Sequence, residues 1–167
     1  MPRGSRRRRV DPEPRPESLS ILFDLFTANQ RVRALLADAM ADSPLRPDEY
    51  AVYSALVDYG ALPPSRLATV LGMPPTTMSH YVTSMRERGH VTSERNPADR
   101  RSFLLTLTAD GRAVHRAAGR AFGQGNDRLL RALDVPAADV RRALQALESA
   151  AEEARAQLAA DSVEEAG

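Results

Sequence analysis

Apolar residues recur at helical spacing along most of the chain, and a different pattern interrupts them only near its middle. Over residues 17–41 they mark one face of a helix, which predicts a single amphipathic helix. Three shorter stretches, at residues 47–60, 63–72 and 74–89, each open on proline and close on glycine. Proline suits the first turn of a helix and glycine the position just after its end, so these stretches predict three short helices in succession.

Each of the three short helices has one apolar face that can join a common core. The predicted core residues are Val52, Leu56 and Tyr59 on the first helix, Leu67, Ala68 and Leu71 on the second, and Met78, Val82 and Met85 on the third.

The pattern changes at residues 90–96 (HVTSERN), where β-branched residues alternate with others as they do in a strand. A return strand follows at residues 102–108 (SFLLTLT). The residues between them, 97–101, are few enough to form the tip of a β-hairpin. They include one aspartate and two arginines.

Two longer helices are predicted after the hairpin. Thr108 and Asp110 can cap the first, which continues to Leu133. Glycine weakens a helix interior unless it allows a bend or a close approach to another helix. We expect one of these at the glycines in the middle of this helix, which are Gly119, Gly123 and Gly125.

The last helix has apolar residues in steps of four and three, the heptad seam of helix–helix packing. The seam consists of Val140, Leu144, Leu147, Ala151, Ala154 and Leu158. It fits either a second subunit or an intramolecular bundle. Residues 17–41 and 109–160 together carry more apolar surface than the small middle region, residues 42–108, can cover, which favours a helical dimerisation region around one central domain.

The two ends of the chain carry opposite charge. The first ten residues contain five arginines and no acid, and residues 1–16 are predicted to be a disordered basic arm. This arm is either a solvated tail or a source of additional contacts to phosphates. Residues 161–167 are predicted to be a fraying acidic tail.

Composition excludes several classes of function. The chain has no cysteine, so disulfides and thiol-based sensing are excluded, and no apolar run approaches the ~20 residues of a membrane span. The basic amino terminus lacks the apolar segment of a secretory signal, so we expect a cytoplasmic protein. His80, His90 and His115 are too far apart to suggest a metal site, and no catalytic motif is recognisable. We therefore expect neither an enzyme nor a cofactor.

The order of helix, short helix, glycine turn, polar-faced helix and hairpin predicts a mainly α winged helix-turn-helix with flanking helices. In such domains the second helix of the motif enters the major groove of DNA. The helix at residues 74–89 has short polar side chains around its amino-terminal half, as that role requires: Thr76, Thr77, Ser79, His80 and Thr83. Arg86 and Arg88 follow later, where they suit phosphate contacts or a structural ion pair.

The charged hairpin tip suits the adjacent minor groove. A narrow minor groove is strongly negative and admits an arginine side chain lengthwise. We expect Arg101 to take this role, with Asp99 pairing with it and holding it outward. Arg100 is then left for phosphate or solvent, and Arg95 lies at the base of the wing.

Residues 63–111 resemble the MarR-type transcriptional regulators. The resemblance is carried by the helix-turn-helix, by the Asp-x-Arg of the wing at Asp99 and Arg101, and by the closing Leu-Thr-x-x-Gly that ends at Gly111. Residues 45–60 resemble the helix that precedes this motif, and the flanking helices fit in length and order. Pro74 and Pro75 depart from the pattern, because the family often has a polar or charged residue there.

The resemblance implies a homodimer that binds double-stranded DNA at a pseudo-palindromic site, more often as a repressor. It also implies a small aromatic effector between the dimer helices and the winged domain. Tyr50, Tyr53, Tyr59, His115 and arginines could line such a pocket, but a structural role is the favoured interpretation of each. A winged-helix module that binds protein instead of DNA is the alternative. The candidate DNA-binding residues are Ser65, Pro75, Thr76, Thr77, Ser79, His80, Thr83, Arg86, Arg95, Asp99, Arg100 and Arg101.

Overall fold

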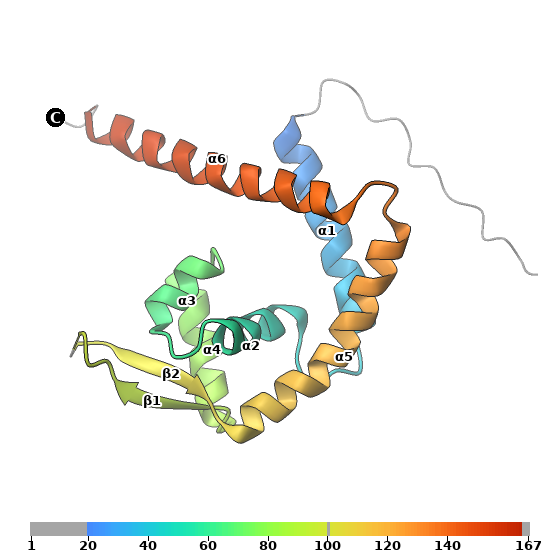
Figure 1. Ribbon diagram of the computed structural model, residues 1–167. Coiled ribbons are helices and arrows are strands. Elements are labelled where there is room, and N and C mark those ends of the chain that lie inside the picture. The colour runs from blue at the N-terminus through green and yellow to red at the C-terminus, as the bar shows by residue number, and fades with distance from the viewer. Residues whose placement is uncertain (1–19, 100, 165–167) are drawn as a thin grey trace, which may run out of the picture.

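The computed structural model describes residues 20–99 and 101–164 (Figure 1). The predicted basic arm at residues 1–16, Arg100 and the last three residues lie outside the described residues. Within them the chain forms helices and one antiparallel hairpin, so the predicted fold class is confirmed. The elements in chain order are α1 (Ile21–Ala39), α2 (Pro47–Asp58), α3 (Pro64–Val70), α4 (Pro75–Glu87), β1 (Val91–Arg95), β2 (Phe103–Leu107), α5 (Ala109–Ala132) and α6 (Ala137–Glu164).

The predicted helix ends are confirmed by backbone geometry. Gly60, Gly72 and Gly89, which follow α2, α3 and α4, all have positive φ angles, of 76°, 60° and 68°. A residue with a Cβ rarely adopts this conformation, so glycine allows the chain to reverse at these points.

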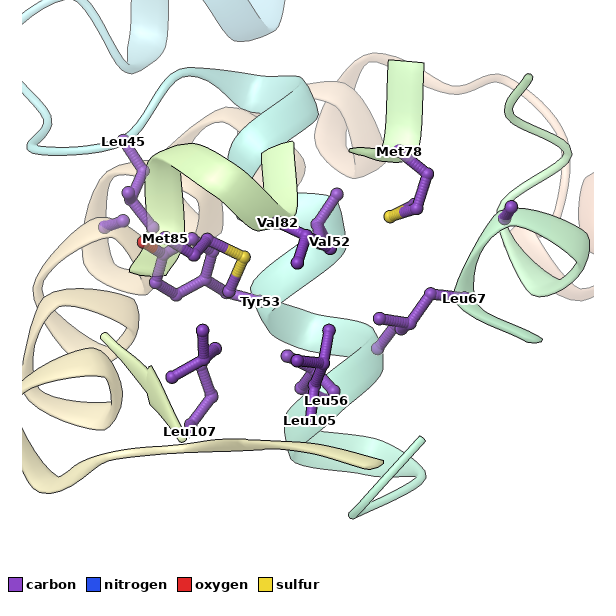
Figure 2. Close-up of a cluster of buried hydrophobic side chains, with 14 of the residues drawn as sticks. Leu45, Val52, Tyr53, Leu56, Leu67, Met78, Val82, Met85, Leu105 and Leu107 are labelled. Carbon is purple, nitrogen blue, oxygen red and sulfur yellow. The ribbon is translucent and has the colours of Figure 1, made fainter. Parts of the chain in front are cut away.

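The central core lies between α2, α3, α4 and the hairpin (Figure 2). Leu67 from α3 and Leu105 from β2 are both fully buried, and Figure 2 shows them converging with Leu56 of α2. On α4 the buried residues are the three predicted ones, Met78, Val82 and Met85. The core therefore fixes which side of α4 faces outward.

The predicted core position of Tyr59 is wrong. Its side chain is 63% exposed, whereas Tyr53, one position after Val52, is completely buried. Tyr59 is the C-cap residue of α2 and lies at the end of the helix, beyond the buried residues of α2, of which Leu56 is the last.

α5 continues without a break from its Thr108 cap, whose hydroxyl accepts a hydrogen bond from the Gly111 backbone N–H at 3.1 Å. Its glycines allow close approach instead. A Cβ on Gly125 would lie 3.0 Å from the Cβ of Ala39 on α1, and one on Gly119 would lie 3.3 Å from the Tyr50 hydroxyl. Close helix contact, one of the two outcomes expected for these glycines, is observed.

The outer helices leave apolar side chains uncovered. None of the residues of α1 is fully buried, and Ile21 and Leu22 are each 68% exposed. α6 stands apart from the winged domain (Figure 1), and its seam residues Leu144 and Leu158 are exposed. The intramolecular bundle is thus not formed by α6 within one chain. None of the helices in the described ranges has the length and apolar character of a membrane span.

Candidate nucleic-acid interface

The outward face of α4 consists of short polar side chains. Thr76, Thr77, Ser79, His80 and Thr83 are all exposed, as is Pro75 in the first turn. Because Met78, Val82 and Met85 anchor the opposite face in the core, these polar groups cannot rotate inward without unpacking the domain.

The amino terminus of α4 is open to an anion. Its N-cap residue is Pro74, which makes no side-chain capping bond, and its first turn contains no acid. The backbone N–H groups of Thr76 and Thr77 therefore keep the orphan positions of a helix start, where the helix dipole favours negative charge.

A shallow groove of about 290 Å³ runs between α3 and α4 and brings several predicted residues together. Ser65 of α3 lines it opposite Ser79, Thr83 and Arg86 of α4. The Arg86 guanidinium donates a hydrogen bond to Ser93 Oγ on β1 at 2.9 Å. Arg86 thus joins the exposed face of α4 to the wing.

The hairpin continues this surface. Ser93 pairs with Leu105 and Arg95 with Phe103, so Ser93 and Arg95 lie on the same face of the strand. Arg95 is exposed near the outer end of that face.

The wing turn is held by its own hydrogen bonds. The Asn96 backbone N–H donates to the Ser102 carbonyl at 3.1 Å, and the Asn96 side-chain amide donates to Ser102 Oγ at 2.9 Å. Asn96 Oδ1 also accepts from the Ala98 backbone N–H at 3.0 Å. The sequence reasoning missed Asn96 and Ser102, although the Asn-Pro dipeptide that opens the turn is a recognisable signal.

The expected pairing of Asp99 with the Arg101 guanidinium is not what the described residues show. Asp99 Oδ1 accepts a hydrogen bond from the Arg101 backbone N–H at 3.0 Å, and no ion pair joins the two side chains. A local Asx turn satisfies the carboxylate and leaves the Arg101 side chain exposed. Asp99 therefore shapes the backbone that carries the arginine. Arg100 lies outside the described residues.

Arg88 makes a structural ion pair, which is the second of the two roles that the sequence allowed for it. Its guanidinium pairs with Glu49 of α2 and also donates to Ser84 Oγ at 2.9 Å. Burial raises the pKa of Glu49, but hydrogen bonds from the Arg46 backbone and from Arg88, together with their charge, bring it below its ordinary value. The ion pair ties the end of α4 to the start of α2, on the side away from the groove residues.

His90 lies at the base of the wing and contacts the core. The Tyr53 hydroxyl and His90 Nδ1 are 2.7 Å apart, and burial together with nearby Arg88 lowers the pKa of His90. A Cβ on Gly111 would lie only 2.2 Å from the His90 carbonyl oxygen, so α5 can start here only with glycine at that position.

A cleft of about 680 Å³ lies between α1, α2 and α5 and also borders the end of α3 at Val70 and Leu71. Of the four residues expected near an effector, Tyr50 and Tyr59 line it, whereas Tyr53 is in the core. His115 lies behind Tyr50 and stacks on its ring, with centroids 4.8 Å apart, while its Nε2 is 3.0 Å from Ser54 Oγ. Burial lowers the pKa of His115.

Comparison with known proteins places this geometry in a family. No family model matches the chain. An uncharacterised helix-turn-helix transcriptional regulator of Mycobacterium leprae is 29% identical over 98 residues, which are 59% of this chain and 68% of that protein.

Solved structures match over a larger part of the chain. A probable transcriptional regulator from Pseudomonas aeruginosa is 30% identical with a TM-score of 0.65, and the match covers 76% of this chain and 95% of that one. The repressor CouR, solved on a 23-mer DNA duplex, is 26% identical with a TM-score of 0.65 over 80% and 92% of the two chains. MarR from E. coli, at 20% identity, shares the fold with a TM-score of 0.63 over 80% and 98%.

The chain belongs to the MarR family of transcriptional regulators. It is accordingly a DNA-binding regulator, and its relatives are regulators rather than enzymes. In this MarR-family protein α3 and α4 form the helix-turn-helix, and β1 and β2 form the wing.

Proposed function

We propose that this protein is a homodimeric repressor that binds a pseudo-palindromic site in double-stranded DNA and is released by a small aromatic effector. The observation that carries the proposal is one continuous exposed surface, which runs from Ser65 and Ser79 through Arg86 to Arg95 of the wing.

The recognition helix is proposed to enter the major groove with its amino-terminal half. Thr76, Thr77, Ser79, His80 and Thr83 supply hydroxyl and imidazole groups that can hydrogen-bond base edges. The proline at Pro75 offers no such group, but the free amides that follow it suit a phosphate oxygen, which supports a positioning role for this helix start.

The wing is proposed to place Arg101 in the minor groove, with Arg95 and Arg100 on phosphates. The hydrogen bonds around Asn96 support this role, because they hold the tip while the Arg101 side chain stays exposed. Glu94 alternates with Ser93 and Arg95 and so lies on the other face of the strand, which keeps its charge away from DNA.

Dimerisation is proposed to bury α1 and α6 against a second copy. Phe26 and Leu22 are 59% and 68% exposed, and Leu158 on α6 is 67% exposed. A two-fold dimer presents its recognition helices about one DNA turn apart. CouR, which was solved on a DNA duplex, supports the use of this fold in DNA binding.

The effector is proposed to bind in the cleft between α1, α2 and α5. At about 680 Å³ the cleft has the size of an ordinary small-molecule site. The PcaV regulator from Streptomyces coelicolor, which is 27% identical with a TM-score of 0.65 over 81% of this chain and 94% of that one, was solved with its natural ligand. Because α1 and α5 belong to the outer helices and α2 to the winged domain, a ligand here can change the separation of the two recognition helices.

Selection of bound sites from random DNA tests the proposal, followed by fluorescence anisotropy at fixed salt. We expect a two-fold symmetric consensus, and about tenfold weaker binding for Arg101→Ala. The control is Arg142→Ala, which removes the same charge from α6, where Arg142 pairs with Asp139. Equal losses in both variants, or no selected consensus, would contradict the proposal and favour the protein-binding alternative.

A further inference from the structure

We infer that the cleft between α1, α2 and α5 selects an aromatic ligand that carries a positive charge, with its cationic group at Asp58 and its ring against Tyr59. This inference rests on the proposed effector role of the cleft and specifies the chemical class that the cleft accepts.

The cationic side chain of the cleft is already engaged. Arg33 of α1 lines one end and donates a hydrogen bond to Asp48 Oδ2 at 2.8 Å. An aromatic carboxylate at this end would meet the like charge of Asp48 beside the guanidinium. The Arg33–Asp48 pair therefore gives this end of the cleft no net attraction for an anion.

The opposite end is negative. Asp58 lines it at the last residue of α2, and no ion pair of the described residues involves this carboxylate. The last turn of α2 contains no basic residue, so the partial negative charge of the helix carboxyl terminus adds to the charge of Asp58 there. Carboxylate and helix dipole both favour a cation at this point.

The imidazole behind the cleft does not reverse this charge. Burial and the nearby Arg116 lower the pKa of His115 more than Asp58 raises it, which favours the neutral imidazole. Its ring instead stacks on Tyr50, with an interplanar angle of 4°, and so stiffens the wall of the cleft.

Aromatic faces complete the site. Tyr59 follows Asp58 directly and is 63% exposed, and Phe122 of α5 packs on Tyr50 with ring centroids 4.8 Å apart. An aromatic ring attracts a cation over its face, and a carboxylate beside it strengthens the attraction. A ligand that joins a ring to an amine matches both features.

Isothermal titration with three probes tests the inference on the full chain. The probes are 4-hydroxybenzylamine, 4-hydroxybenzyl alcohol and 4-hydroxybenzoate, which share one phenol ring and differ in charge. We expect the amine to bind about tenfold more tightly than the alcohol, and the carboxylate to bind most weakly, since a charged hydrogen bond is worth more than a neutral one. Asp58→Asn should remove the advantage of the amine and leave the affinity of the alcohol unchanged.

Three results would overturn the inference. These are no binding of the amine, a preference for the carboxylate that Arg33→Gln abolishes, or an amine preference that survives Asp58→Asn. A separate measurement, release of bound DNA followed by anisotropy, tests the effector role. If the amine binds through Asp58 but does not release DNA, the ligand class stands and the effector role is refuted. If only the carboxylate releases DNA, the effector role stands and the ligand class is refuted.

Discussion

The winged domain and the outer helices differ in how far they bury their apolar side chains within one chain. The winged domain completes its core within one chain, and residues such as Leu67, Met78 and Leu105 are at most 1% exposed. α1 has no buried residue, and both α1 and α6 present exposed leucines. Intrachain packing therefore stabilises the winged domain, whereas the outer helices leave apolar side chains exposed, which the proposed homodimer would cover.

The same division appears at the helix amino termini. α1, α2, α5 and α6 each have an acid in the first turn, which satisfies the positive end of the helix dipole within the chain. α3 and α4 have none. The two helices of the helix-turn-helix thus have no acid of their own first turn at the positive end of the dipole, an arrangement that suits an anion such as a phosphate.

The largest expected effect is the loss of folding stability caused by a cavity in the core of the winged domain. Leu105→Ala should lower the free energy of unfolding by about 3 kcal/mol, because it removes a fully buried side chain between α2 and α3. Urea denaturation measures this, and the loss should be the same at every protein concentration. Phe26→Ala in α1 is the comparison: its effect should grow as the protein is diluted. A concentration-dependent loss for Leu105→Ala alone would reverse the contrast between the two regions.

A smaller effect is expected where α1 and α5 meet. Gly125→Ala should destabilise the protein by about 1 kcal/mol, because the new Cβ would press on Ala39 at 3.0 Å. Gly123→Ala is the matched control in the same helix, since its Cβ would meet nothing within 4 Å. Alanine is the better helix former, so Gly123→Ala should stabilise by up to about 1 kcal/mol. Thermal melts that give both variants the same sign would show that α1 and α5 do not pack this closely in solution.

The wing allows a test of how Asp99 acts. Asp99→Asn should leave DNA affinity nearly unchanged, because an asparagine oxygen can accept the same hydrogen bond from the Arg101 backbone N–H. Asp99→Ala should weaken binding by about 1 kcal/mol through the loosened turn. Anisotropy titrations at one salt concentration compare the two variants. Similar losses of affinity in both variants would indicate that Asp99 acts through its charge, in the ion pair with Arg101 that the sequence suggested.

The sequence predicts the winged domain well because its signals are local. Prolines and glycines mark the ends of α2, α3 and α4 in the sequence. The 3.6-residue spacing of apolar residues identifies the buried face of α4. The same period misplaces Tyr59, because it does not say where α2 stops. The exposure of the predicted α4 residues follows directly from the position of Met78 and Val82 on the other face.

The features that the sequence could not predict depend on partners far along the chain. Arg88 had two plausible roles, and only the fold places Glu49 beside it. The cleft is assembled from four helices, so its charges cannot be predicted from any one stretch of the sequence. Asp99 is a different case: its partner is two residues away, but whether a carboxylate bonds to backbone or to guanidinium is decided by the turn geometry.

The smallest expected effect is a loss of folding stability at low pH, to which one histidine of each region should contribute. Burial lowers the pKa of His90 in the winged domain and of His115 on α5, from an ordinary value of 6.5. The unfolded chain therefore binds more protons below that value, and the stability present at pH 7 should decrease as the pH falls through about 6.5. Urea denaturation midpoints at pH 7.5, 6.5 and 5.5 measure this decrease. The pKa of Glu49 is lowered from its ordinary 4.5, so its protonation does not contribute in this pH range. His90→Gln and His115→Gln should each flatten the decrease, and together remove most of it. A decrease that persists in the double variant would assign the acid sensitivity to other groups and leave both imidazoles without a role in it.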